Sequence, residues 1–181
     1  MADHAKNPAE AYDSTTITLH WVTAVLVAIQ FLIGRTTNFL PRGSLRVDIW
    51  SVHVVFGFAL ASAVVLGMLW RATRSRRLAP LNRGLPHLVA VATHRLLDLL
   101  LLIMVALGIT DVFAHGFPLF NLWHFPKFGG DELLRSVNAW HGLVANIIVA
   151  VALLHSAAAL FHHHVIKDGV LRRMRPTMTG R

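Results

Sequence analysis

Long runs of apolar residues recur four times along this chain of 181 residues. A helix of about 20 such residues crosses the hydrocarbon core of a bilayer. The first, second and fourth runs contain no Lys, Arg, Asp or Glu, and the third run contains only two such residues, Arg95 and Asp98. The pattern therefore predicts an all-α integral membrane protein, a bundle of four transmembrane helices. The predicted spans are Ile17–Gly34, Ile49–Trp70, Leu85–Thr110 and Val137–Ile166.

Composition supports a membrane protein and excludes several kinds of site. Apolar residues make up 55% of the chain and charged residues 14%, against about 25% charged in soluble domains. The chain has no cysteine, which excludes disulfides, Cys-ligated zinc, cysteinyl iron–sulfur clusters and thioether-linked haem. The net charge of +8 fits loops beside anionic membrane lipid. We therefore expect lipid contacts and no nucleic-acid partner.

The distribution of basic residues predicts the orientation. Most of the 17 Lys and Arg residues fall in the two tails and in the connection between the second and third spans. By the positive-inside rule these segments are cytoplasmic. We expect a cytoplasmic tail at residues 1–16, a transmembrane domain at 17–166 and a basic cytoplasmic tail at 167–181. On the outer side, Gly116–Gly130 is rich in Gly, Pro and aromatic residues, and we expect a short interfacial helix there.

Five histidines lie inside the predicted spans, where an ionisable side chain is costly and usually functional. They are His20, His53, His94, His141 and His155. His141 and His155 are fourteen residues apart, so they share one helix face and are separated by about 21 Å. By depth, His53 matches His141 near the outer face, and His20 matches His155 in the inner half.

Two depth-matched pairs from different helices indicate two metal centres. A bundle clamps a flat cofactor between imidazoles in this way, and two axial imidazoles per iron are typical of b-type haem. Gly57 and Gly142 lie near His53 and His141 and would let a porphyrin approach the backbone. Two alternatives remain open: histidines that only pack and hydrogen-bond, and a zinc site, for which no i, i+4 His pair exists. His94 is the chief rival of His20 as inner ligand.

The order and spacing of these motifs resemble the bacterial cytochrome b561 family over roughly residues 14 to 176. The matching segments are Leu19-His20-Trp21, Val52-His53-Val54 with Gly57, His94, Trp140-His141-Gly142, and Leu154–Leu160 with His162-His163, Lys167-Asp168 and Leu171. The segment that begins at Leu154 is the most specific of these.

The resemblance implies a bundle of four helices in the bacterial inner membrane that encloses two haem b groups. It implies His20, His53, His141 and His155 as axial ligands and electron transfer to the quinone pool. Some family members are similar to superoxide oxidases, which take electrons from superoxide outside and reduce ubiquinone. We therefore expect an oxidoreductase with superoxide as outer donor and quinone as acceptor.

Two other functions remain open. The chain is also similar to cytochrome b anchor subunits that relay electrons from a periplasmic hydrogenase or dehydrogenase, although its outer loops are short for docking a partner. A haem-free structural protein or transporter is the third possibility.

Secondary candidates surround the inner pair. Asp98 replaces a neutral residue of the family pattern and shares a face with His94. The two side chains would protonate a quinone, steady a haem propionate, or simply hold the third span to the bundle. His162 lies on a face similar to that of His155 and is expected at a propionate. On the outer side, Arg35, Arg42, Arg46 and Arg135 would steer a small anion or pair with propionates and lipid.

Overall fold

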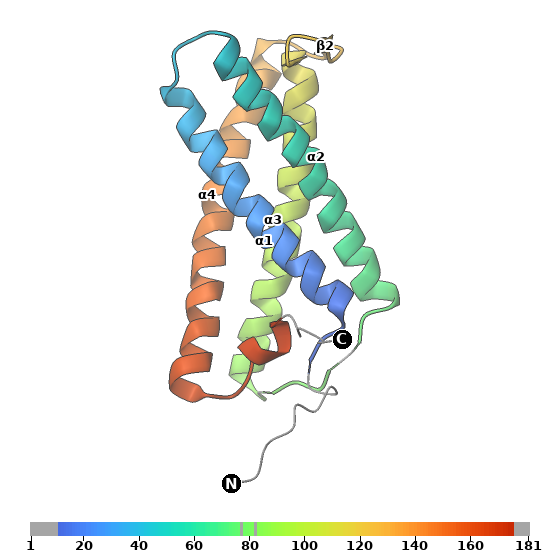
Figure 1. Cartoon of the computed structure of the whole chain (residues 1–181), viewed down its shortest axis with the longest axis vertical. Coiled ribbons are helices and arrows are strands. Elements are labelled where there is room, and N and C mark those ends of the chain that lie inside the picture. The colour runs from blue at the N-terminus through green and yellow to red at the C-terminus, as the bar shows by residue number, and fades with distance from the viewer. Residues whose placement is uncertain (1–10, 77, 82, 176–181) are drawn as a thin grey trace, which may run out of the picture.

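Four long helices make up almost all of the computed structural model, which describes residues 11–76, 78–81 and 83–175. They run up and down in chain order as an elongated bundle (Figure 1). All four are long and apolar enough to cross a membrane, which confirms the all-α prediction. The helices are α1 (Ser14–Thr36), α2 (Ser44–Thr73), α3 (Leu85–His115) and α4 (Asp131–Phe161).

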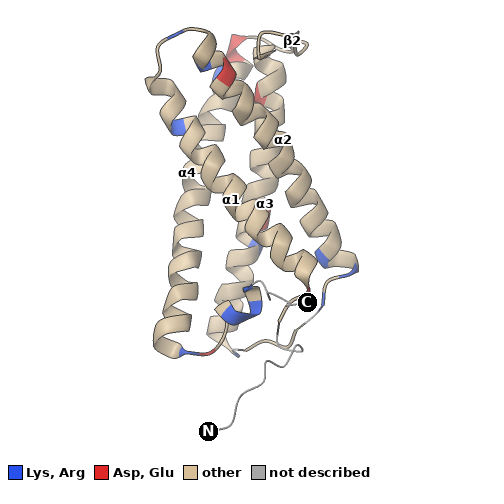
Figure 2. Ribbon diagram, in the orientation of Figure 1, with Lys and Arg blue, Asp and Glu red and all other residues tan. Residues whose placement is uncertain are grey.

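The bundle consists of two helix pairs. α1 packs mainly against α2, α3 packs mainly against α4, and α2 makes a smaller contact with α3. The buried centre contains Leu100, Val144 and Ile148. Large apolar side chains elsewhere face outward; Leu154, for example, is 71% exposed. Figure 2 shows Lys, Arg, Asp and Glu gathered near the two ends, with helix shafts between them almost free of charge. Such a surface suits lipid rather than water.

Each helix is longer than its apolar run. α1 begins at Ser14, inside the predicted tail 1–16. α3 continues past Thr110 to His115 and is closed by Gly116, whose φ of 64° is left-handed. α4 ends at Phe161, and His162–Ile166 form a π-helix that ends at left-handed Lys167. Except at the start of α3 and the end of α4, the predicted spans were too short, because backbone hydrogen bonding continues beyond the apolar residues. Residues 1–10, 77, 82 and 176–181 of the predicted tails and loop lie outside the described part.

The expected interfacial helix at Gly116–Gly130 is wrong. The segment forms a small antiparallel hairpin of β1 (Pro118–Leu119) and β2 (Trp123–His124). Phe120 and Asn121 have φ values of 51° and 56°, the left-handed pair that a type I′ turn requires. The fully buried Ser51 hydroxyl accepts a 2.7 Å hydrogen bond from the Phe120 amide and anchors this turn to α2. We call this end of the bundle the hairpin end.

The opposite end, which we call the base, is where α1 begins and α4 ends (Figure 1). Asp13 caps α1 through the Thr16 amide at 2.9 Å and accepts the Trp70 indole N–H at 2.8 Å and the Arg76 amide at 3.2 Å. The chain returns to this point in the short 3-10 helix η4 (Leu171–Met174), where the Met174 carbonyl accepts from the Trp21 indole. A second such helix, η2 (Thr37–Phe39), follows α1 at the hairpin end.

Hydrogen bonding determines the charge state of Asp13. Burial raises its pKa, but the hydrogen bonds from the Thr16 amide and hydroxyl, the Trp70 indole and the Arg76 amide outweigh burial. Together they hold the pKa well below its ordinary value. Asp13 therefore joins the start of α1 to the end of α2 as a carboxylate.

Replacing Ser51 with alanine should loosen the hairpin, because the Phe120 amide loses its acceptor. We expect a loss of about 1–2 kcal/mol in stability and faster hydrogen exchange at Phe120. Ser62→Ala is the matched control, since Ser62 on α2 is exposed and bonds only to the Phe58 carbonyl one turn earlier. Equal exchange rates in the two variants would contradict the anchoring role.

Replacing Asp13 with alanine should cost about 1 kcal/mol or more at pH 7, as expected for a lost N-cap. Because the native pKa is lowered, this stabilisation is present above the ordinary carboxyl pKa and is lost as pH falls through the native value. The gap in thermal unfolding between the two proteins should therefore narrow below about pH 4. Glu132→Ala, in the first turn of α4, should behave like the unmodified protein throughout. A gap independent of pH would contradict the assignment.

Candidate functional site

The span histidines gather at two levels of the bundle. At the hairpin end, His53 of α2 faces His141 of α4 with ring centroids 6.2 Å apart. Toward the base, His20 of α1 faces His155 of α4 with centroids 6.4 Å apart. All four side chains are half-buried. The structure therefore brings together the same residues that were matched by depth.

Each histidine pair bridges the two helix pairs. The first pair of helices contributes His20 and His53, and the second contributes His141 and His155. Among the described helices, α4 packs closely on α3, and each of its two span histidines also faces a histidine ring carried by α1 or α2. The buried Val144 and Ile148 lie between His141 and His155 along α4. The two levels are therefore separated by an apolar layer.

His94 of α3 lies at the level of His20 and His155, toward the base. Its ring centroid lies 5.1 Å from that of His155, which is direct ring contact. Two metal–nitrogen bonds of about 2 Å each, together with the distance from each nitrogen to its ring centre, amount to about 6 Å. That spacing fits His20–His155 and His53–His141 better than it fits His94–His155.

The donor set at each level suits a haem better than a free metal ion. Zinc usually takes four protein ligands, whereas no group of three or more His, Cys, Asp or Glu residues forms a metal site in the described part. A haem iron already has four porphyrin nitrogens and needs only two axial ligands. The Nδ1 atoms of His53 and His141 are buried without hydrogen-bond partners, so both rings carry unused polar atoms. The residues present therefore fit the group.

Glycines lie directly against the histidine rings of His53 and His141, the pair at the hairpin end. A Cβ on Gly108 would come within 3.3 Å of His141 Cε1, and one on Gly34 within 3.6 Å of His53 Cε1. A Cβ on Gly142 would meet nothing within 4 Å beyond its neighbours, so space adjoins His141 there. A Cβ on Gly57 would meet the Gln30 amide nitrogen at 3.2 Å. Sequence reasoning selected the latter two and missed Gly34 and Gly108, which only helix packing reveals.

Two secondary candidates have other partners. Asp98 accepts a 2.6 Å hydrogen bond from Arg71 of α2, so the acid joins α3 to α2 as an ion pair. His162 Nδ1 lies 2.5 Å from Asp168 Oδ2, and the other oxygen of Asp168 accepts from the Val170 amide. His162 is thus held within the turn that follows α4.

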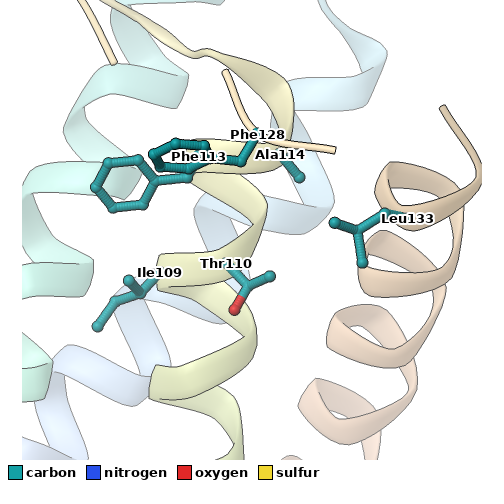
Figure 3. A pocket seen from close by; sticks show the side chains of 6 residues that line it. All are labelled: Ile109, Thr110, Phe113, Ala114, Phe128 and Leu133. Carbon is teal, nitrogen blue, oxygen red and sulfur yellow. The ribbon is translucent and has the colours of Figure 1, made fainter. Parts of the chain in front are cut away.

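The hairpin end carries exposed cations and two hollows. Arg35 donates to Asn146, and Arg46 donates to Asn38 at 3.1 Å. Arg42 and Arg135 are exposed. One hollow of about 450 Å³ is lined by His115, Leu134, Arg135, Asn138 and Ala139. A second, mostly apolar pocket of about 220 Å³ is shown in Figure 3 and is lined by Ile109, Thr110, Phe113, Ala114, Phe128 and Leu133.

Comparison with known proteins identifies the family. The sequence profile of the prokaryotic cytochrome b561 family matches residues 11–177. A cytochrome b562 of Cereibacter sphaeroides is 33% identical over 180 residues, covering 91% of this chain and 96% of the relative. A probable superoxide oxidase CybB of Yersinia pestis is 28% identical over 177 residues, covering 93% and 98%. Cytochrome b561 homolog 1 of Escherichia coli is 26% identical, covering 91% and 97%. With four membrane-length helices and the family profile along nearly its whole length, this chain belongs to the prokaryotic cytochrome b561 family.

Proposed function

We propose that this membrane b-type cytochrome carries electrons across the bilayer between a donor at the hairpin end and the quinone pool. Two haem b groups would be held by His53 with His141 and by His20 with His155. The observation that carries the proposal is the pair of facing imidazoles at each of two levels. When bound, haem b supplies a site that accepts and releases one electron.

The protein residues shape these sites for electron transfer. Two imidazoles would hold each haem, and such a site would supply electron transfer rather than oxygen binding. The spacing of His141 and His155 on one rigid helix places the sites about 21 Å apart along α4. The layer around Leu100, Val144 and Ile148 keeps water and charge out of the space between them.

Charge distribution supports placing the base in the cytoplasm. The connection after α2 and the segment after α4 are rich in arginine, and the positive-inside rule places such segments inside. The hairpin end then faces outward. The described basic residues at or near the base are Arg71, Arg74, Arg76, Arg83, Arg95, Lys167, Arg172, Arg173 and Arg175.

Superoxide is the donor we propose at the outer end. A relative that aligns with nearly the whole chain is named a probable superoxide oxidase. The exposed Arg42 and Arg135 would attract a small anion to this end, and cationic surfaces speed such encounters.

We assign Asp98 to holding α3 against α2 rather than to quinone protonation, because the Asp98 carboxylate already forms an ion pair with Arg71.

Purified protein made with ample haem should contain two b haems per chain, measured by haem extraction and by the reduced-minus-oxidised spectrum. His53→Ala and His141→Ala should each lose one haem, and the same one. His20→Ala and His155→Ala should each lose the other, because a single imidazole holds haem weakly.

His94→Ala distinguishes the two possible inner ligands and should retain both haems. His124→Ala, in the exposed strand β2, is the control for a histidine outside the bundle. Loss of the inner haem in His94→Ala, with retention in His20→Ala, would overturn the inner pairing. Absence of haem from the unmodified protein would overturn the proposed function.

Superoxide should reduce the oxidised protein rapidly without a partner, as followed by haem absorbance in a stopped-flow experiment. The double variant Arg42→Gln/Arg135→Gln should slow this step several-fold, since electrostatic steering accounts for about 10- to 1,000-fold in rate. Arg74→Gln, an exposed arginine at the base, is the control and should have no effect. A protein that ignores superoxide but co-purifies with a large redox subunit would instead be an anchor subunit.

A further inference from the structure

Unpaired buried polar atoms concentrate around one of the two histidine pairs. In the described part of the chain, four buried side-chain atoms lack a hydrogen-bond partner, and all lie toward the hairpin end. An unpaired buried donor or acceptor costs about 1–3 kcal/mol, so such a concentration calls for an explanation. The atoms are Gln30 Oε1, His53 Nδ1, Asp111 Oδ1 and His141 Nδ1.

Asp111 lies on the face of α3 that is turned toward His141. A Cβ on Gly108 would lie 3.3 Å from Cε1 and 3.8 Å from Nδ1 of His141, so this edge of the imidazole faces α3. Asp111 follows Gly108 by three residues and therefore shares its helix face, one turn nearer the hairpin. The Asp111 carboxylate interacts electrostatically with His141 and with His115. His115 is exposed, whereas His141 Nδ1 is buried.

We infer that Asp111 accepts a hydrogen bond from Nδ1–H of His141 when Nε2 of that ring binds the outer haem iron. This inference rests on the proposed function. A neutral imidazole that ligates through one nitrogen carries its proton on the other, and that proton needs an acceptor. Of the two unpaired acceptors, Gln30 Oε1 is a neutral amide whose NH₂ group is bound to the His53 carbonyl at 2.8 Å. Asp111 supplies the carboxylate.

The hydrogen bond has a consequence for the outer site. A carboxylate that accepts from a ligating histidine fixes its ring and raises its basicity. A more basic ligand stabilises the ferric state and lowers the reduction potential. Toward the base, the acid near His94 is Asp98, and Arg71 neutralises it. Asp111 therefore lowers the potential of the outer haem selectively, which favours electron movement toward the base.

The test is a redox titration of the purified dihaem protein together with its low-temperature EPR spectrum. Asp111→Asn should raise the potential of one haem and change the EPR signal of the same haem, leaving the other haem unaltered. The affected haem should be the one absent from His53→Ala. Asp131→Asn is the matched control, because it removes the same charge from an exposed position at the hairpin end.

The remaining outcomes also decide the matter. A raised potential with an unaltered EPR signal would show a charge effect without the hydrogen bond and overturn the inference, as would no shift at all. If Asp111→Asn loses the outer haem, Asp111→Glu must retain it, and loss in both variants would assign Asp111 to packing. Failure of the unmodified protein to bind two haems would instead contradict the proposed function.

Discussion

An imidazole inside a bilayer must find a partner, because neither lipid nor a close-packed core can replace the hydrogen bonds of water. This constraint organises the bundle. α1 with α2, and α3 with α4, form the two most closely packed pairs of helices. The histidines lie where the two pairs meet, so the join between the halves is made at two polar points with an apolar layer between them. A site built in this join depends on both halves and belongs to neither.

The two levels differ in their polar surroundings. Toward the base, acids are already engaged: Asp13 caps α1, Asp98 pairs with Arg71, and Asp168 holds His162. Near the hairpin end, a carboxylate and an amide oxygen remain unpaired beside the histidines. Sites with the same two ligands thus have different electrostatic surroundings. Under the proposed function, such a difference would give electron transfer a direction without a difference in cofactor.

Most of the fold could be predicted from the sequence because lipid imposes a strong constraint. A charge-free run of about 20 residues has few alternatives to a membrane helix. The helix ends were less predictable, since Ser44 and Asp131 begin helices outside the apolar runs. The hairpin was missed because its type I′ turn contains Phe120 and Asn121 rather than the usual Asn-Gly.

The site was predictable to the extent that it depends on depth. Depth along straight helices placed His53 with His141 and His20 with His155, and the same argument could not separate His20 from His94. Asp111 was missed for a definite reason: the predicted third span ended at Thr110, one residue too early to include it. Which side chains lie against a ring, as Gly34 and Gly108 do, depends on helix rotation and packing, which one sequence does not reveal.

Because α4 carries one member of each pair, a single helix fixes both the distance between the two sites and the relative orientation of their histidines. One residue inserted between His141 and His155 would turn one ring away from its partner by about 100°. Only changes near whole turns keep both rings on one face, and adding two turns takes about seven residues and lengthens the separation by about 10 Å. The distance between the sites can therefore change only in steps of about whole helical turns. Under the proposed function, fine adjustment of electron exchange would be left to the side chains in the intervening layer.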